Sequence, residues 1–327
     1  MLHNTAPDLS AYLFVYFTDA THSVYFALSR DGYSFTDVND GKPVMNGAEL
    51  AEQKGIRDPH IMRGPDGAFY MAMTDLHIYA KQAGFRDTEW ERPGELYEWG
   101  NNRALIFMRS TDLIQWSHAI FRVDTAFPEM ADIGCAWAPE TIYDEAAGKL
   151  MVYFTTRFGK GPNKLYYSYA DDDFTKLEDT PKELFQYPKE NVNIIDADIT
   201  KVGDKFHMFY VAHDKPGGLR HAVSDRINEG YVFDPSKIDP EAVACEAPNV
   251  WKRLGTETYV LMYDIFGIQP HNFGFSETTD FVHFNDIGHF NEGVMKATNF
   301  ASPKHGAIIP VTESEARALA DHWNFAF

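Results

Sequence analysis

Short apolar and aromatic runs recur along the whole chain, and polar turns separate them. The clearest runs cover residues 13–18, 24–29, 69–74, 149–156, 206–212 and 258–265. They are rich in Phe, Tyr and Val, which favour half-buried strands. The run at 69–74 comes just after Gly-Pro-Asp-Gly at 64–67, which is a strong turn signal. The pattern therefore predicts an all-β chain built from short strands.

A second pattern follows five of the strand-like runs. A serine ends each run, an aspartate follows, and an aromatic or large apolar residue comes a few places later. The intervals between the serines are 81, 58, 56 and 52 residues, and the serines are Ser29, Ser110, Ser168, Ser224 and Ser276. A period of this size in a strand-rich chain is typical of a β-propeller with one four-stranded blade per repeat. Five copies predict five blades.

The fifth unit is divided between the two ends of the sequence. Its strands at 13–18 and 24–29 open the chain, and its inner strand is expected near His305. Pairing of the N- and C-terminal strands in one blade would close the ring and remove an exposed edge. We therefore expect a single five-bladed domain over residues 1–327. Residues 77–103 are too long for a hairpin and predict a loop insertion, and residues 312–323 predict one amphipathic helix.

The composition narrows the classes of partner. The chain has 327 residues and a net charge of −19. Phosphate binding relies on clustered Lys and Arg, so we expect neither nucleic acid nor an anionic membrane as a partner. No apolar run reaches the roughly 18 residues of a membrane helix, and no signal peptide is visible. This fits a cytoplasmic protein, or a secreted or periplasmic one whose leader was removed. The two isolated cysteines, Cys135 and Cys245, predict free buried thiols.

Acidic residues stand near the start of four successive units, at Asp58, Glu140, Asp196 or Asp198, and Glu246. Each one alone is more simply explained as part of a turn or a strand start. In a propeller, however, the first strand of every blade lines the central axis, so these carboxyl groups would meet. Glycoside hydrolysis needs one protonated carboxyl group as acid and one carboxylate as base or nucleophile. A third carboxylate nearby raises the pKa of the acid by repulsion.

The motifs Arg57-Asp58-Pro59, Ile195-Asp196 and Glu246-Ala-Pro248, in this order and spacing, resemble glycoside hydrolase family 43. The members of this family are five-bladed β-propeller enzymes that act mainly on arabinose- and xylose-containing glycans. The stretch Trp137-Ala-Pro-Glu140 looks like that of the arabinofuranosidase-type members. The resemblance runs from about residue 11 to residue 312. It implies an inverting, exo-acting α-L-arabinofuranosidase that releases arabinose from arabinan- or arabinoxylan-type glycans or oligosaccharides.

The resemblance also implies a role for each matching position. Asp58 matches the general base, Glu246 matches the general acid, and Asp196 matches the residue that modulates the pKa of the acid. His305 matches a histidine that helps hold a calcium ion or another cation in the central channel, and no organic cofactor is expected. The substrate-binding positions are Glu140, Trp137, Arg57 and Asp198. Glu140 or Asp198 could instead share the modulating role.

Two alternatives remain open from the sequence. A β-D-xylosidase of the same family would use the same pocket architecture. A propeller that binds glycans or proteins without catalysis belongs to another class. A complete set of base, modulator and acid in phase with the repeat favours an enzyme, because a binding module has no reason to keep it. Serine hydrolases, zinc hydrolases and nucleotide-binding loops find no support, because their motifs do not occur.

Overall fold

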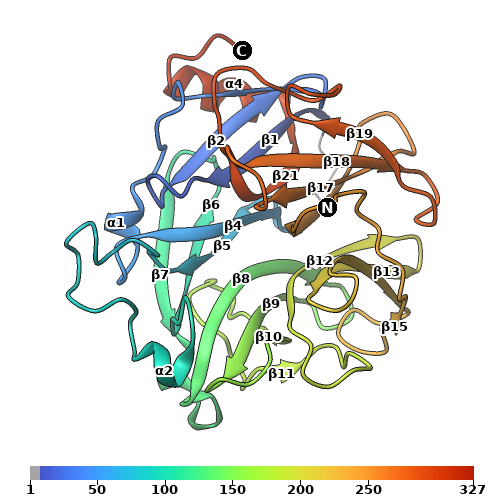
Figure 1. Ribbon diagram of the computed structural model, residues 1–327. Coiled ribbons are helices and arrows are strands. Elements are labelled where there is room, and N and C mark those ends of the chain that lie inside the picture. The colour runs from blue at the N-terminus through green and yellow to red at the C-terminus, as the bar shows by residue number, and fades with distance from the viewer. Residues whose placement is uncertain (1–7) are drawn as a thin grey trace.

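The computed structural model of the protein describes residues 8–327 and shows five β-sheets arranged around one central axis (Figure 1). Each sheet is one blade of a propeller, and all strand pairs are antiparallel except one short pair at a blade edge. The fold class expected from the repeats is thereby confirmed.

Four blades are continuous in sequence. The first contains β4 (Ile56–Arg63), β5 (Phe69–Asp75), β6 (Ala104–Ser110) and β7 (Trp116–Arg122). The second contains β8 (Ile133–Asp144), β9 (Lys149–Phe158), β10 (Lys164–Tyr169) and β11 (Lys182–Glu183). The third contains β12 (Ile194–Val202), β13 (Lys205–Ala212), β14 (Gly218–Ser224) and β15 (Val232–Phe233). The fourth contains β16 (Glu246–Lys252), β17 (Tyr259–Ile265), β18 (Asn272–Thr278) and β19 (Asn285–His289).

The fifth blade joins the two ends of the described chain. Its strands lie in the order β21 (Lys304–Thr312), β1 (Leu9–Phe17), β2 (Val24–Ser29), β3 (Ser34–Asp37) and β20 (Lys296–Ala297). β1 pairs antiparallel with both β21 and β2, so this split blade closes the ring as expected. The innermost strands β4, β8, β12, β16 and β21 contact one another in sequence around the axis.

Apolar side chains fill the spaces between neighbouring blades. All seven residues of β5 are buried, because a middle strand of a blade is covered on both faces. One core cluster joins Phe107 of the first blade to Phe154 of the second. Such packing between blades holds the inner strands at fixed positions around the axis, and with them the polar side chains that they carry.

Every inner strand is irregular at the same level. In β4 the pairing with β5 is interrupted between Arg57 and His60, and the intervening Asp58 has φ of 55°. The same interruption occurs between Trp137 and Glu140, between Ile195 and Asp198, and between Glu246 and Asn249. In β21 it falls between Lys304 and Ala307, opposite Phe17 and Val15. Bulges of this kind redirect side chains, and they are common beside active sites.

The sequence predicts that the acidic residues occupy equivalent positions on their strands, and the positions of the bulges show that they do not. Asp58 and Asp196 both occupy the bulge itself, while Glu246 precedes the bulge of its strand by one position. Glu140 and Asp198 come after the bulge, at the level of His60. The four acidic positions are therefore not equivalent, because they belong to two levels of the central channel.

The repeated serine and aspartate build the turns after the third strands of the fifth and first blades. The Asp31 carboxylate accepts hydrogen bonds from the backbone N–H groups of Tyr33 and Ser34, and Ser29 accepts one from Gly32. Asp112 and Ser110 do the same in the first blade. In the fourth blade Thr278 takes this position with Asp280, two residues after the expected Ser276.

The helices are few and short. α4 (Glu313–His322) packs on β1, and Thr312 and Glu315 form a capping box at its start, which confirms the expected helix. The others are α1 (Gly47–Leu50), α2 (Gly94–Tyr97), α3 (Val123–Ala126) and η1 (Pro128–Met130). Cys135 and Cys245 are free and buried, as expected. Within residues 8–327, no helix has the length and apolar character needed to span a membrane.

Candidate active site

A cavity of about 590 Å³ lies over the bulges of the inner strands. Five of the predicted site residues line it, namely Asp58, Asp196, Glu246, Arg57 and Trp137. Glu140 and Asp198 are buried and do not line the cavity, and His305 lies behind Asp58. The structure thus brings the three predicted catalytic carboxyl groups into one space, from the first, third and fourth blades.

Asp58 is held in its ionised form by its surroundings. Its Oδ1 lies 3.3 Å from Nδ1 of His305, and its Oδ2 accepts a hydrogen bond of 2.7 Å from the Thr74 hydroxyl. Burial alone would raise the pKa of Asp58. The charge and hydrogen bond of His305, together with Arg57 and Thr74, outweigh burial and hold that pKa well below its usual range. Asp58 is therefore a carboxylate that can accept a proton.

Asp196 lies in the opposite electrostatic situation. Burial raises its pKa well above the usual range, and repulsion from Glu246 and Asp58 raises it further against the opposing charge of His305. Its Oδ2 accepts a hydrogen bond of 3.3 Å from the backbone N–H of Ala247, the residue that follows Glu246. The raised pKa of Asp196 favours a proton on the side of the cavity where Asp196 and Glu246 lie.

Glu246 is the more accessible carboxyl group of this pair. Its side chain is 21% exposed, while Asp196 is 6% exposed. Oε1 of Glu246 lies 3.3 Å from the Lys304 ammonium, which also pairs with Asp264 at 2.9 Å. Burial would lower the pKa of Lys304, but Glu246 and Asp264 outweigh it and raise that pKa. Lys304 stays cationic, and its charge is divided between two carboxyl groups.

Two consecutive residues of β21 therefore hold the two ends of the site. Lys304 contacts Glu246 on one neighbouring strand, and His305 contacts Asp58 on the other. Three further residues of the site, Lys304, Asp264 and Thr74, were not predicted from the sequence. Thr74 and Asp264 pair directly opposite Arg57 and Glu246, on the second strands of their blades. A polar residue at the end of an otherwise apolar run was the available signal for both.

A second polar level lies deeper in the channel. His60, Glu140 and Asp198 come from three adjacent inner strands, and one donor atom from each lies within 4.8 Å of the others. Burial and repulsion from Asp198 raise the pKa of Glu140 well above its usual range. Burial also raises the pKa of Asp198 to about 7, although hydrogen bonds from Glu140, Val250 and Asn249 oppose the rise. His60, Glu140 and Asp198 are buried and do not line the cavity.

The family resemblance implies a cation in the central channel, and its candidate ligands are His305 and the donors of the second polar level. Nδ1 of His305 faces Asp58, and although burial lowers the pKa of His305, Asp58 raises it to a net value above normal. Its other ring nitrogen, Nε2, is buried and has no hydrogen-bond partner among the described residues. Two buried carboxyl groups, Glu140 and Asp198, lie near the imidazole of His60 and offer oxygen ligands that suit a divalent cation. His305 and the set of Glu140, Asp198 and His60 are therefore both candidates to hold the cation.

Aromatic side chains form one wall of the cavity. Trp99 and Trp137 line it and meet edge to face with ring centroids 5.7 Å apart. Trp137 donates a hydrogen bond of 2.9 Å to the carbonyl of Gly100, and the Arg157 guanidinium lies 4.6 Å from its ring and donates to the carbonyl of Trp99. Trp99 and Tyr79 belong to the predicted insertion, so this segment supplies part of the wall.

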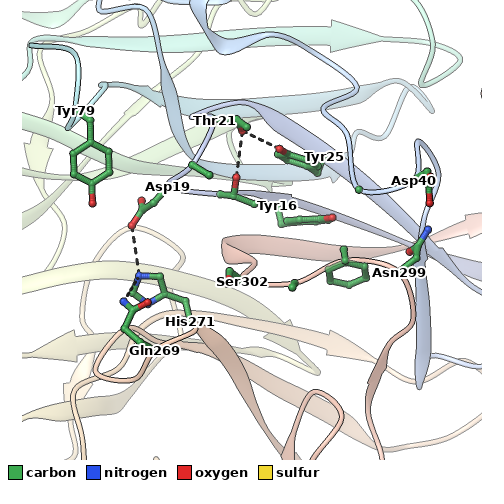
Figure 2. Close-up of a pocket in the computed structure, with 15 residues that line it drawn as sticks. Tyr16, Asp19, Thr21, Tyr25, Asp40, Tyr79, Gln269, His271, Asn299 and Ser302 are labelled. Carbon is green, nitrogen blue, oxygen red and sulfur yellow. Dashed lines mark hydrogen bonds and ion pairs between the residues drawn. The ribbon is translucent and has the colours of Figure 1, made fainter. Parts of the chain in front are cut away.

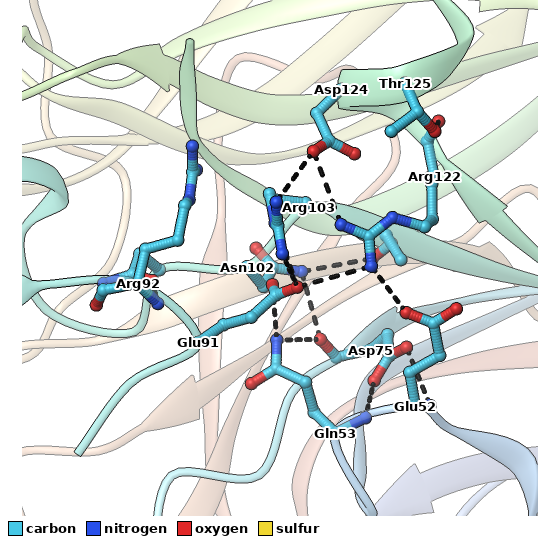
Figure 3. Close-up of polar contacts among 12 residues, drawn as sticks. Glu52, Gln53, Asp75, Glu91, Arg92, Asn102, Arg103, Arg122, Asp124 and Thr125 are labelled. Carbon is cyan, nitrogen blue, oxygen red and sulfur yellow. Dashed lines mark hydrogen bonds and ion pairs between the residues drawn. The ribbon is translucent and has the colours of Figure 1, made fainter. Parts of the chain in front are cut away.

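A polar network fixes the other side of the insertion to the first blade (Figure 3). Gln53 donates hydrogen bonds to the carbonyl of Asp75 and to Glu91 of the insertion. Glu91 also pairs with Arg103 at 2.8 Å and with Arg122 at 3.5 Å. The insertion is thus attached on both flanks, and its aromatic residues hold a defined position over the cavity.

Comparisons with known proteins agree with this architecture. A family model described as "Probable glycosyl hydrolase domain", for a group related to glycosyl hydrolase family 43, matches residues 8–317. A curated α-L-arabinofuranosidase of Bifidobacterium longum subsp. longum is 24% identical over 247 residues, which cover 69% of this chain and 21% of that protein. The chain therefore spans about a fifth of the length of the curated relative it matches.

Two solved structures show the same fold at low sequence identity. A family-43 β-1,3-galactosidase has a TM-score of 0.58 and 13% identity, and the match covers 85% of this chain and 56% of that one. An endo-1,4-β-xylanase of Bacteroides thetaiotaomicron has a TM-score of 0.55 and 13% identity over 88% of this chain and 92% of that one. With the family model spanning nearly all of the described propeller, the chain belongs to the glycosyl hydrolase family related to family 43.

Proposed function

We propose that this protein is an inverting glycoside hydrolase that releases L-arabinofuranose from the ends or side chains of arabinan- or arabinoxylan-type glycans. The observation that carries the proposal is the difference between the carboxyl groups of one cavity. Asp58 has a pKa held well below its usual range, and Asp196, beside Glu246, has a raised pKa. Environments that push the pKa values of neighbouring carboxyl groups apart mark the base side and the acid side of a site. Here Asp58 stands on the base side, and Glu246 stands beside Asp196 on the acid side.

In the proposed reaction, Asp58 accepts a proton from a water molecule that attacks the anomeric carbon. Glu246 donates its proton to the leaving oxygen as the glycosidic bond breaks, and Asp196 keeps a proton available on that side. We assign the donor role to Glu246 because its side chain is 21% exposed, whereas Asp196, which also lines the cavity, is buried. An inverting enzyme needs the two carboxyl groups roughly 6.5–9.5 Å apart to admit the water. Asp58 and Glu246 lie on β4 and β16, with β21 between them.

The choice of arabinose rests on the curated relative described as an α-L-arabinofuranosidase. A β-D-xylosidase remains the second candidate, because both sugars are neutral pentoses that suit a cavity with a polar floor and an aromatic wall. Nitrophenyl α-L-arabinofuranoside and nitrophenyl β-D-xyloside separate these candidates directly. Glycan binding without turnover of either compound, or of natural oligosaccharides, would replace the enzyme with a binding propeller.

The acid role has a specific test. Glu246→Gln should lower kcat/KM by about 10²- to 10⁴-fold on natural oligosaccharides, whose leaving groups need a proton, and much less on activated aryl glycosides. Glu257→Gln is the matched control, because the Glu257 side chain is 87% exposed in the turn between β16 and β17. Equal losses on both substrate classes would contradict the acid role. NMR of the first-formed sugar should show the inverted anomer.

We also propose that a calcium ion, where one is bound, is held by Glu140 and Asp198 with His60. The carboxylate oxygen atoms of Glu140 and Asp198 suit calcium. Without a cation, these two buried carboxyl groups would need to share a proton. The ion would supply positive charge beneath the cavity floor and fix three inner strands relative to one another. Asp58, Asp196 and Glu246 would carry out the proton transfers themselves.

A further inference from the structure

A second cavity, of about 720 Å³, adjoins the catalytic one (Figure 2). The two cavities share four lining residues, namely Asp19, Tyr79, Gln269 and His271. Figure 2 shows Tyr79, Asp19 and His271 on one side of the second cavity and Asp40 and Asn299 on the other. The second cavity therefore leads away from the catalytic carboxyl groups, along the fifth blade.

The shared residues connect the two spaces chemically. Asp19 pairs with Arg57 at 2.6 Å, and Arg57 precedes the proposed base Asp58. The other carboxylate oxygen of Asp19 lies 3.6 Å from His271, which contacts Gln269 at 3.1 Å. Gln269 and His271 stand in the loop between β17 and β18, in the same blade as Glu246. The boundary between the two cavities therefore includes residues of the blade that carries Glu246, the proposed acid.

The lining selects a neutral ligand rich in hydroxyl groups. Its formally charged residues are Asp19 and Asp40, and no Lys or Arg is among the residues that line it. An anionic ligand such as a uronic acid or a phosphate would find no cationic partner there. Many of the residues that line the second cavity carry hydroxyl or amide groups. The Thr21 hydroxyl, for example, forms hydrogen bonds with the Tyr25 hydroxyl at 2.9 Å and with the Thr18 hydroxyl at 3.2 Å.

Aromatic rings also line the second cavity, and they suit the apolar faces of a sugar ring. Phe300 stacks on Tyr16 with ring centroids 4.9 Å apart, and Tyr16 stacks on Tyr25 at 5.1 Å. Phe300 is partly exposed, and Tyr79 is 44% exposed at the boundary of the two cavities. Rigid aromatic faces beside hydroxyl groups suit a pyranose or furanose ring, which is apolar on its faces and polar at its edge.

We propose that this second cavity binds the sugar units on the leaving-group side of the scissile bond, as a neutral oligosaccharide chain. The proposal rests on the proposed glycosidase function, and it makes the substrate an oligosaccharide or polysaccharide rather than a small glycoside. The catalytic cavity takes the sugar that is released. The second cavity takes the chain from which that sugar is cut, with Phe300 and Tyr79 as stacking surfaces.

The test fills the second cavity without touching the catalytic residues. Ala301 lines it and is exposed, so Ala301→Trp adds bulk there with little effect on folding. The variant should lower kcat/KM on arabino- or xylo-oligosaccharides by about tenfold or more, through KM, and leave nitrophenyl glycosides nearly unchanged. Phe300→Ala should act in the same direction more weakly. Val232→Trp, at an exposed position of β15, is the matched control.

Binding measurements separate this proposal from the proposed function. Calorimetric titration of arabino- and xylo-oligosaccharides of increasing length into Glu246→Gln, with and without Ala301→Trp, needs no turnover. The affinity for Glu246→Gln should rise with chain length, and Ala301→Trp should remove the rise. Equal affinity for short and long oligosaccharides, or equal losses by Ala301→Trp on oligosaccharides and nitrophenyl glycosides, would overturn the subsite. Length-dependent binding to Glu246→Gln, together with no turnover of the same oligosaccharides by the unmodified protein, would retain the subsite and overturn the enzyme.

Discussion

The inner strands carry two polar levels that look alike in sequence and differ in chemistry. The upper level, with Asp58, Asp196 and Glu246, opens into a cavity. The lower level, with Glu140 and Asp198, comes two or more residues further along the same type of strand and is closed. Both levels place carboxyl groups near a histidine. A carboxyl group can act on a substrate only at the upper level, because only that level lines the cavity.

The charges of the two levels are balanced in different ways. At the upper level, His305 and Lys304 provide positive charge beside Asp58 and Glu246. At the lower level, no Lys or Arg of the described residues lies within ion-pair distance of Glu140 or Asp198, and burial raises the pKa values of both. The upper level can therefore keep a carboxylate ionised, while the lower one needs a proton or a bound cation.

The largest expected effect distinguishes the two levels by activity. Asp58→Asn should lower kcat/KM by about 10²- to 10⁴-fold, because it removes the proton acceptor and preserves the shape. Asp198→Asn should retain most of kcat and lower the free energy of unfolding by about 1–3 kcal/mol, because its amide would face the N–H donors of Asn249 and Val250. Steady-state kinetics and thermal unfolding of both variants measure this.

The control for that pair is Asp225→Asn, because Asp225 has a side chain that is 78% exposed on the third blade. It should change neither activity nor Tm appreciably. A loss of kcat in Asp198→Asn as large as that in Asp58→Asn would show that the division into two levels has no functional meaning.

A smaller effect is expected from Thr74, which donates to Asp58 and accepts from the backbone N–H of Ala138. The Thr74 hydroxyl is one of the groups that lower the pKa of Asp58, so Thr74→Val should raise that pKa. The base must be ionised, and activity is lost as pH falls through its pKa. The acid limb of kcat/KM should therefore move to higher pH, with an activity loss of about tenfold near that limb.

The pH profile distinguishes this from a purely structural effect. A general loosening of the site would lower kcat/KM by the same factor at every pH, without moving the limb. Thr74→Ser keeps the hydroxyl and is the matched control, and it should retain the acid limb of the unmodified protein. A Thr74→Val limb that does not move would contradict the role of Asp58 as the base.

The propeller and the meeting of three distant acids could be predicted from the sequence, because both follow from a periodic pattern. Strand and turn signals at regular spacing place Asp58, Asp196 and Glu246 on inner strands without any knowledge of contacts. The offset of Glu140 and Asp198 could not be predicted in the same way. It depends on residues inserted at the bulge, and the same letters could pair regularly or irregularly with the next strand.

Other features needed spatial neighbours that no local pattern reveals. The contact of Lys304 with Glu246 and Asp264 joins two blades, and its partners are 40 or more positions away in the chain. Thr278 replaces the expected Ser276 because either hydroxyl can accept the turn N–H, so composition alone does not fix the position. The second cavity is formed by loops of different blades, and its shape depends on their tertiary packing.

The lower level gives a prediction measured by stability. Calcium should raise the Tm of the unmodified protein by a few degrees, and EDTA should reverse the rise, because a ligand bound only to the folded state stabilises it by about 2.7 kcal/mol at a hundredfold excess over Kd. Asp198→Asn should abolish the response, whereas Asp58→Asn should keep it. An unchanged Tm in calcium and EDTA would mean that Glu140 and Asp198 share a proton instead.

The smallest expected effect concerns the insertion above the upper level. Glu91→Gln removes the charge that pairs with Arg103 and Arg122, while its amide can still contact Gln53. These side chains are partly exposed, so the free energy of unfolding should fall by no more than about 1 kcal/mol. Because the insertion supplies Trp99 and Tyr79 to the cavity wall, KM should rise about two- to threefold with kcat unchanged. Glu257→Gln is again the control, and steady-state kinetics measure the effect. A fall in kcat at constant KM would mean that the network around Glu91 acts on the catalytic carboxyl groups themselves. The insertion would then do more than supply the aromatic wall of the cavity.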